Sequence, residues 1–238
     1  MKLKVCGMKY ESNIMELSKL NPSFMGFIFH KASKRFIEES IPDLPHSITK
    51  IGVFVDADIS YILDTILVNK LNGVQLHGNE TVDFINKLKA ECQNQKLSLK
   101  YIKVFAVDDS FNFNQTKPFT SVCDYFLFDT KGPLPGGNGF AFDWKKLNEY
   151  TCDVPYLLSG GIGIHNKNDI KSTTFLAGLL IDLHGNSNRL QAEFEQRIAD
   201  ASIKPKNLGR QFENAKSKIP HEGGKLRACR CEIESCGN

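Results

Sequence analysis

Short apolar runs alternate with stretches of helical periodicity along most of this 238-residue chain. The runs are brief and unbroken, as is typical of parallel strands that are covered on both faces. Strands are predicted at Lys2–Val5, Phe24–Phe29, Lys50–Val55, Gly73–Leu76, Leu99–Phe105, Tyr125–Phe128, Val154–Leu158 and Leu176–Leu183. Eight strands with intervening helices, in one chain of this length, favour a closed (β/α)8 barrel over an open doubly wound sheet.

The segments between these runs carry apolar residues at helical spacing. In one of them, Val82, Ile85 and Leu88 form a stripe along one face. Helices are predicted at Ser12–Leu20, Ile59–Asn69, Thr81–Cys92, Asp143–Tyr150 and Asn166–Ser172. No internal repeat or low-complexity linker indicates a second domain. We therefore expect one α/β domain, a TIM barrel over residues 1–219.

Composition and charge indicate which kinds of molecule this chain can bind. A formal net charge of +3 is too small and too scattered to indicate a nucleic-acid-binding protein, although it suits a small anionic substrate. No apolar run approaches the roughly 20 residues of a membrane span, and the first residues lack a signal-peptide pattern. Seven cysteines without such a signal indicate reduced thiols. We expect a cytoplasmic protein with no membrane or nucleic-acid partner, and a monomer as the default state.

The C-terminal part contains more helical segments than are needed to complete a barrel. Leu190–Ile198 and Leu208–Ile219 are both amphipathic, and Pro205 separates them, so one extra helix is predicted. Residues 220–238 are expected to be a disordered tail. The alternative is a metal site built from Cys229, Cys231, Cys236 and His221, although zinc would want four ligands at a recognisable spacing.

Cys6 ends the first predicted strand, and Gly7 lets the chain turn there. The carboxyl end of a strand is where α/β barrels place their chemistry. The alternative interpretation is a small buried filler, because free cysteine is among the most buried residue types. Matching polar residues at other strand ends favour the catalytic interpretation.

Asp129 ends the sixth predicted strand. The loop that follows, Thr130–Ala141, is long and rich in glycine and proline, and such loops are uncommon in compact domains unless they are functional. An aspartate beneath such a lid suits a general acid, because partial burial raises the pKa of a carboxyl group. A helix cap is the commoner role for aspartate, and Asp143 is expected to cap the next helix.

A glycine-rich loop, Ser159–Gly163, follows the seventh predicted strand. Glycines let backbone N–H groups approach an anion, and a following helix adds its positive end. Barrels often hold phosphate in the loops after strands seven and eight, so Gly160, Gly161 and Gly163 are predicted phosphate contacts. A plain glycine-rich turn is the alternative.

Two further strand ends carry polar groups. His77 lies in a Gln-x-His-Gly turn that would point into the same mouth, although a lone histidine is usually structural. Arg35 follows the second strand and could hold a carboxylate through two hydrogen bonds, although a solvated arginine is commoner.

Together these stretches resemble the phosphoribosylanthranilate isomerases, barrel enzymes of tryptophan biosynthesis. The similarity covers residues 2 to about 183, with the motifs in the family's order. They are Lys4–Lys9, Gly26–Phe29 with Ser33–Arg35, Ile51–Val55, Val74–Gly78, Phe128–Asp129 with Gly136–Gly139 and Phe142–Trp144, and Leu158–Gly163.

The resemblance implies an Amadori rearrangement of N-(5-phosphoribosyl)anthranilate to its 1-deoxyribulose isomer, without metal or cofactor. It implies Asp129 as the acid that opens the ribose to a Schiff base and Cys6 as the base that removes the C2 proton. A thiol can act so only with a lowered pKa. Arg35 would hold the anthranilate carboxylate, and the loops after strands seven and eight the phosphate.

The chain departs from the family at two places. Lys34 stands where relatives usually have proline, and the turn after strand eight contains an apparent insertion. Asp182 is assigned there to substrate binding, and Ser187 is a weaker candidate. Two alternatives stay open: another phosphate-binding barrel such as indole-glycerol-phosphate synthase, and a catalytically silent paralogue. The catalytic lysine and glutamates of the first family have no counterparts at the strand ends of this chain. Intact Cys6 and Asp129 argue against the second alternative.

Overall fold

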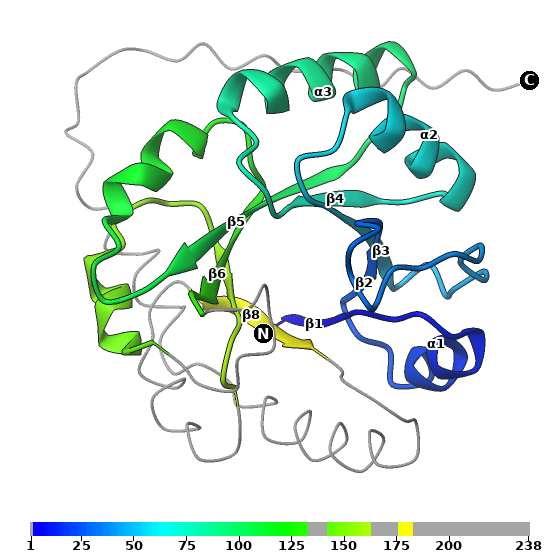
Figure 1. The fold of residues 1–238 in the computed structure, drawn as a ribbon, viewed down its shortest axis with the longest axis horizontal. Helices are drawn as coiled ribbons and strands as arrows, with labels where there is room; N and C mark the ends of the chain where they lie inside the picture. Colours follow the sequence, from blue (N-terminus) through cyan, green and yellow to red (C-terminus); the bar gives the residue numbers. More distant parts are fainter. Residues whose placement is uncertain (1, 133–141, 163–175, 183–238) are drawn as a thin grey trace, which may run out of the picture. The chain divides into compact units, whose positions relative to one another are not determined.

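The structure, a computed structural model, describes residues 2–132, 142–162 and 176–182. Eight parallel strands follow one another in chain order and close into a barrel (Figure 1). They are β1 Lys2–Cys6, β2 Phe24–Ile28, β3 Thr49–Phe54, β4 Gly73–Leu76, β5 Lys100–Val107, β6 Tyr125–Thr130, β7 Tyr156–Leu158 and β8 Leu176–Asp182. The barrel closes where β1 pairs with β8, with Cys6 beside Asp182. The predicted fold class is confirmed.

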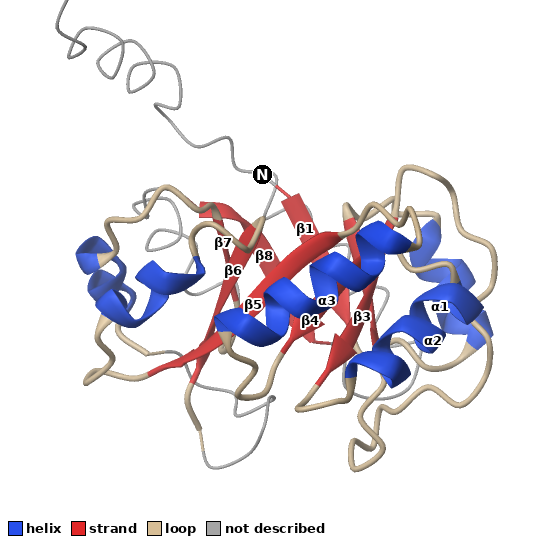
Figure 2. Cartoon of the chain, turned by 90° about the horizontal axis from the view of Figure 1, so that it is seen from above, coloured by secondary structure: helices blue, strands red, loops and turns tan. Residues whose placement is uncertain are grey.

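Three α-helices lie outside the ring of strands: α1 Glu11–Ser18, α2 Ile59–Asn69 and α3 Val82–Asn94 (Figure 2). The amino end of α3 is fixed by Thr81, whose hydroxyl oxygen accepts a hydrogen bond from Phe84 N. Between β2 and β3, the described chain runs through turns and one isolated bridge, Ile28 to Phe36, in place of a helix.

In the described ranges, 3₁₀ helices follow β5 and β6: η1 Phe113–Phe119, and η2 Trp144–Glu149 in place of the α-helix expected there. η1 was not predicted, and Pro118 inside it removes a backbone donor. The prediction of an α-helix over Asp143–Tyr150 was wrong in type. Asp143 does cap this segment, because its carboxylate accepts from Lys145 N. Both short helices pack through aromatic rings, with Phe113 and Tyr150 each 5.2 Å from the ring of Phe128.

The core has two layers, one inside the barrel and one between the strands and the helices. Successive side chains along each strand point alternately into one layer and the other. The interior of the barrel holds Cys6, Phe24, Ile28, Ile51, Val53, Ile102, Val104, Leu127, Leu157 and Leu180. The residues between them, such as Val5, Val74 and Leu76, face outward and pack in the layer that contains the helices. Residues two positions from an interior residue share its face, so this alternation decides which polar side chains enter the barrel mouth.

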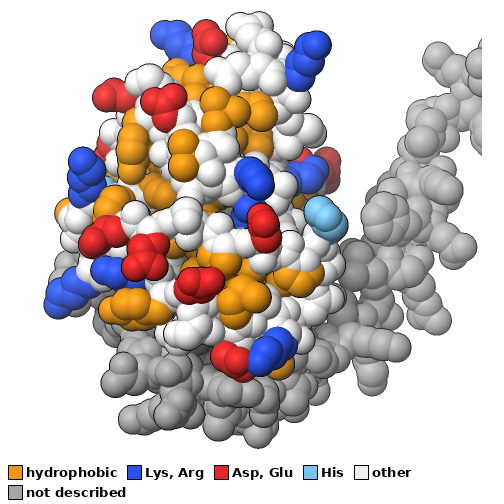
Figure 3. Space-filling model, turned by 90° about the vertical axis from the view of Figure 1, so that its right-hand side faces the viewer, with side chains coloured by type: hydrophobic (Ala, Val, Ile, Leu, Met, Phe, Trp, Pro, Cys, Tyr) orange, Lys and Arg blue, Asp and Glu red, His pale blue; other side chains and the backbone are white. Residues whose placement is uncertain are grey.

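Several predictions fall outside the described residues: the helix over Asn166–Ser172, the two C-terminal stripes, the tail and its cysteines. Within the described ranges, no disulfide joins any of Cys6, Cys92, Cys123 and Cys152. No helix in those ranges is long and apolar enough to cross a membrane. The face that carries α1 and α2 mixes apolar side chains with charges of both signs (Figure 3).

Candidate active site

The polar residues predicted at strand ends come together at the carboxyl end of the barrel. Cys6 ends β1, Asp129 lies next to last in β6, and His77 follows β4 directly. Cys6 belongs to the interior layer, and Asp129 is two residues after Leu127, which does too. The base and acid implied by the sequence therefore both face the barrel interior at its C-terminal mouth, where barrel enzymes place their chemistry.

Cys6 is 3% exposed, and the backbone turns sharply after it. Gly7 has φ of +84°, a conformation that favours glycine, and Gly7 N and Met8 N both donate to the carbonyl of Gly26 on β2. The side chain of Arg35 packs on the same turn: a Cβ on Gly7 would lie 2.7 Å from both its Cδ and one of its terminal nitrogens. Glycine at position 7 thus makes room for the guanidinium beside the thiol.

Asp129 is connected to His77 and Gln75 by a chain of polar contacts. Its carboxylate lies 3.9 Å from His77 Nε2, and the Asp129 side chain is 12% exposed. His77 Nδ1 lies 3.2 Å from the amide nitrogen of the buried Gln75. An amide nitrogen only donates, so Nδ1 accepts and Nε2 carries the proton of the neutral ring. In this tautomer His77 presents its Nε2–H toward Asp129.

The glycine-rich loop after β7 begins as predicted. Gly160 and Gly161 have φ of +84° and +62°, and the side chain of Thr130 packs so closely on Gly160 that a Cβ there would collide with it. Thr130 belongs to β6, so the loop is seated directly beside the strand that carries Asp129. Gly163 lies outside the described residues. Asp182 ends β8 next to Cys6 in register, which puts its backbone at the same mouth.

A buried ion pair, which the sequence analysis did not identify, supports the turn that carries His77. Lys103 Nζ lies 2.9 Å from Glu80 Oε2 and donates to the carbonyl of Gly78. Glu80 also accepts from the backbone N–H groups of Asp56 and Gly78. The pair therefore ties the loops after β3 and β4 to β5. Its partners are separated by more than twenty residues, so no local motif signals it.

Lys4 is a further buried residue that the sequence analysis did not single out. It is fully buried in β1, and its Nζ has no hydrogen-bond partner among the residues that the structure describes. The signal was present in the strand: Lys4 is two residues before Cys6 and so shares its face. The sequence analysis treated this lysine only as part of a motif.

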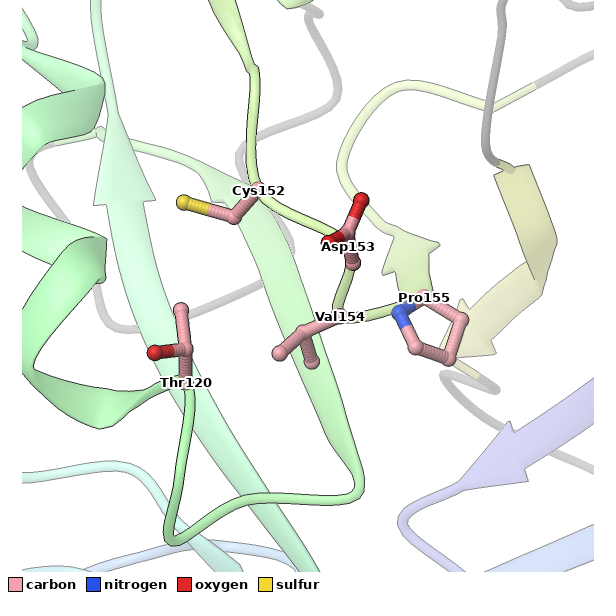
Figure 4. A pocket seen from close by; sticks show the side chains of 5 residues that line it. All are labelled: Thr120, Cys152, Asp153, Val154 and Pro155. Carbon is pink, nitrogen blue, oxygen red and sulfur yellow. The ribbon is translucent and has the colours of Figure 1, made fainter. Parts of the chain in front are cut away.

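Within the described ranges, neither metal-ligating side chains nor the hollow beside Thr120 forms an alternative centre. Across the described ranges, no cluster of three or more His, Cys, Asp and Glu side chains could hold a metal ion. One surface hollow is lined by Thr120 and the segment Cys152–Pro155 (Figure 4). These residues precede β6 and β7, at the end of the barrel opposite Cys6 and Asp129. The hollow contains none of the predicted site residues.

Comparison of the sequence with known families gives a match over residues 3–186 to the model described as N-(5'phosphoribosyl)anthranilate (PRA) isomerase. A curated relative with this name from Parabacteroides distasonis is 38% identical over 176 residues, which span 71% of this chain and 77% of the relative. One from Campylobacter jejuni is 37% identical over 171 residues, spanning 70% and 80%.

Solved structures agree on the fold. Phosphoribosyl anthranilate isomerase from Thermotoga maritima superposes with a TM-score of 0.68 at 24% identity, covering 84% of this chain and 98% of that one. A second, crystallised with reduced 1-(o-carboxyphenylamino)-1-deoxyribulose 5-phosphate, gives 0.64 at 21% identity, with the same coverage. At these identities the structures support the barrel fold only.

Proposed function

We propose that this chain, which belongs to the N-(5'-phosphoribosyl)anthranilate isomerase family, isomerises N-(5'-phosphoribosyl)anthranilate in tryptophan biosynthesis. The product is 1-(2-carboxyphenylamino)-1-deoxyribulose 5-phosphate. One observation carries the assignment of residues: Cys6 and Asp129 both lie on inward positions at the C-terminal ends of their strands. One is a candidate base and the other a candidate acid, as an aldose–ketose rearrangement requires.

The reaction is an internal redistribution of protons and electrons. Asp129 protonates the ring oxygen, the ribose opens and a Schiff base forms at C1. Cys6, as thiolate, then takes the proton from C2 to give an enolamine. Return of a proton to C1 and loss of the proton from the C2 hydroxyl give the ketone, so nothing is gained or lost overall. Each transfer needs its partner in the correct protonation state.

The remaining predicted contacts hold the substrate. Arg35, packed on the turn after Cys6, is placed to bind the anthranilate carboxylate, because guanidinium donors match a carboxylate in pairs. Gly160 and Gly161 offer backbone N–H groups for the phosphate, with Gly163 and Asp182 as further candidates. His77 contacts Asp129 and so also orients the acid. Binding at the phosphate, away from the reacting carbons, positions the sugar for both transfers.

The assay is the loss of fluorescence of freshly made N-(5'-phosphoribosyl)anthranilate. We expect Cys6→Ala and Asp129→Asn each to lower turnover by about 10²–10⁴-fold while leaving the fold intact, because each removes a proton-transfer partner and little packing. Cys92→Ala is the matched control, since Cys92 is another buried thiol but lies on α3. A wild-type protein that binds phosphate without turnover would favour the silent-paralogue alternative.

A further inference from the structure

Lys4 and Cys6 share the inward face of β1. Gly26 on β2 has no side chain, and the ends of the Lys4 and Cys6 side chains occupy the space that one would fill. A Cβ on Gly26 would lie 2.6 Å from Lys4 Nζ and 2.7 Å from Cys6 Sγ. Since both atoms lie within 2.7 Å of one point, they are separated by no more than twice that distance. We propose that the Lys4 ammonium is the counter-cation of the Cys6 thiolate. The inference deepens the proposed function and depends on it for the role of Cys6.

Lys4 is buried without a hydrogen-bond partner for its Nζ among the described residues. The other buried lysines of the described chain have partners: Lys103 pairs with Glu80, and Lys50 donates to the carbonyl of Asn69. Lys4 is buried as deeply, yet its Nζ has no hydrogen-bond partner in the described residues. A buried charge is costly unless an opposite charge lies close. A thiolate at Cys6 provides that charge, and the ammonium in turn lowers the cost of forming the thiolate.

The other charged groups around Cys6 come from different elements. Arg35 packs on Gly7 and would also favour the thiolate, whereas an ionised Asp129 on β6 would disfavour it. His77, after β4, contacts Asp129. From β2, the facing positions Gly26 and Ile28 carry no charge. Lys4 differs from Arg35 in lying below the thiol, inside the barrel, where substrate does not reach it and water screens it little.

In the proposed reaction Lys4 neither gains nor loses a proton. The Cys6 thiol releases its proton to solvent when the active form is made, and Lys4 keeps its own, so the pair is neutral overall. During turnover Cys6 accepts the C2 proton and later gives one back, while Lys4 remains protonated. Lys4 is thus a positioning residue: it sets the basicity of Cys6 and touches no substrate atom.

The test is the pKa of the Cys6 thiol, measured without substrate. Methyl methanethiosulfonate, a small neutral reagent, is reacted with the full chain across pH, and labelling of Cys6 is followed by peptide mapping. In the wild type we expect a thiol pKa below the ordinary value of about 8.5. Lys4→Met should raise it by about one to two units, as expected for a cation at this distance at intermediate dielectric. Lys50→Met removes a buried lysine that faces outward, so it should leave the pKa of Cys6 unchanged.

The pH profile of kcat/KM gives the second readout. In Lys4→Met its acidic limb should move to higher pH, with activity recovering at alkaline pH, whereas a purely structural role would lower activity at all pH values. A wild-type Cys6 pKa at or above 8.5, or one that Lys4→Met leaves unmoved, would overturn the pairing. Lys4→Gln provides the same comparison if the methionine variant does not fold. Because labelling needs no substrate, an inactive protein with a low Cys6 pKa would contradict the proposed function alone.

Discussion

At the scale of single residues, the contact between His77 and Asp129 changes how both are understood. The sequence analysis assigned His77 to substrate binding, and the structure places its Nε2 3.9 Å from Asp129 Oδ2. A ring that Gln75 holds in one tautomer orients the carboxyl group of the proposed acid. The position of that carboxyl group therefore depends on β4 and the turn after it as well as on its own strand.

We predict that His77→Leu lowers kcat by about tenfold, or about 1.4 kcal/mol, because it removes the polar ring whose Nε2 lies 3.9 Å from the Asp129 carboxylate. His77→Gln, whose amide can still donate toward Asp129, should lose less. Steady-state kinetics of both variants make the comparison. Equal losses in the two variants, or a change confined to KM, would mean that His77 serves only in substrate binding.

At the scale of elements, strands and sites were predictable to different degrees. The ends of β4 and α2 agree with the prediction to the residue, and in α2 a full helical stripe leaves little choice of state. η1 was missed because its sequence, with Pro118 and the polar residues Asn114 and Gln115, forms no apolar stripe of α-helical period. Cys6 and Asp129 could be singled out from the sequence because each ends a predicted strand, whereas Lys4 and the Glu80–Lys103 pair depend on which faces and strands meet in space.

The Glu80–Lys103 pair belongs to this scale, since it joins the turns after β3 and β4 to β5. We predict that Lys103→Met lowers the free energy of unfolding by about 3–5 kcal/mol, because Glu80 stays buried without its cation. Urea unfolding provides the measurement. Lys19→Met breaks an exposed pair on the chain's first helix and should cost less than about 1 kcal/mol. A similar small loss in both variants would show that the buried pair does not hold these turns.

The loop after β7 supports a prediction about anions. Inorganic phosphate should inhibit competitively and raise the melting temperature, because a ligand that binds only the folded state stabilises it, by about 2.7 kcal/mol at 100 times its Kd. Replacing Gly161, whose φ is +62°, with leucine should remove both effects by filling the phosphate's place. Thermal melts with sulfate and chloride as comparison salts check specificity. A phosphate effect that survives in this variant would place the anion site at another loop.

At the scale of the whole molecule, closure of the barrel connects the two ends of the described sheet. β8 pairs with β1 over five residues, from Lys2 beside Gly178 to Cys6 beside Asp182. The strand that carries the proposed base is therefore held in place by the last strand of the barrel. Any change that releases β8 should affect Cys6 as well as the fold.

The proposed domain limits, residues 1–219 and 220–238, follow from this dependence and from the sequence. Beyond Pro220, the only large aliphatic residues are Leu226 and Ile233, too few to offset the entropy of ordering the segment. We therefore predict that truncation after Ile219 leaves melting temperature and turnover unchanged, with or without a chelator. Truncation after Leu183 should give insoluble protein, because the amphipathic stripes at Leu190–Ile198 and Leu208–Ile219 are the segments available to cover the outer face of β8. A loss of stability in the shorter deletion, reversed by added zinc, would instead assign the C-terminal cysteines to a metal site.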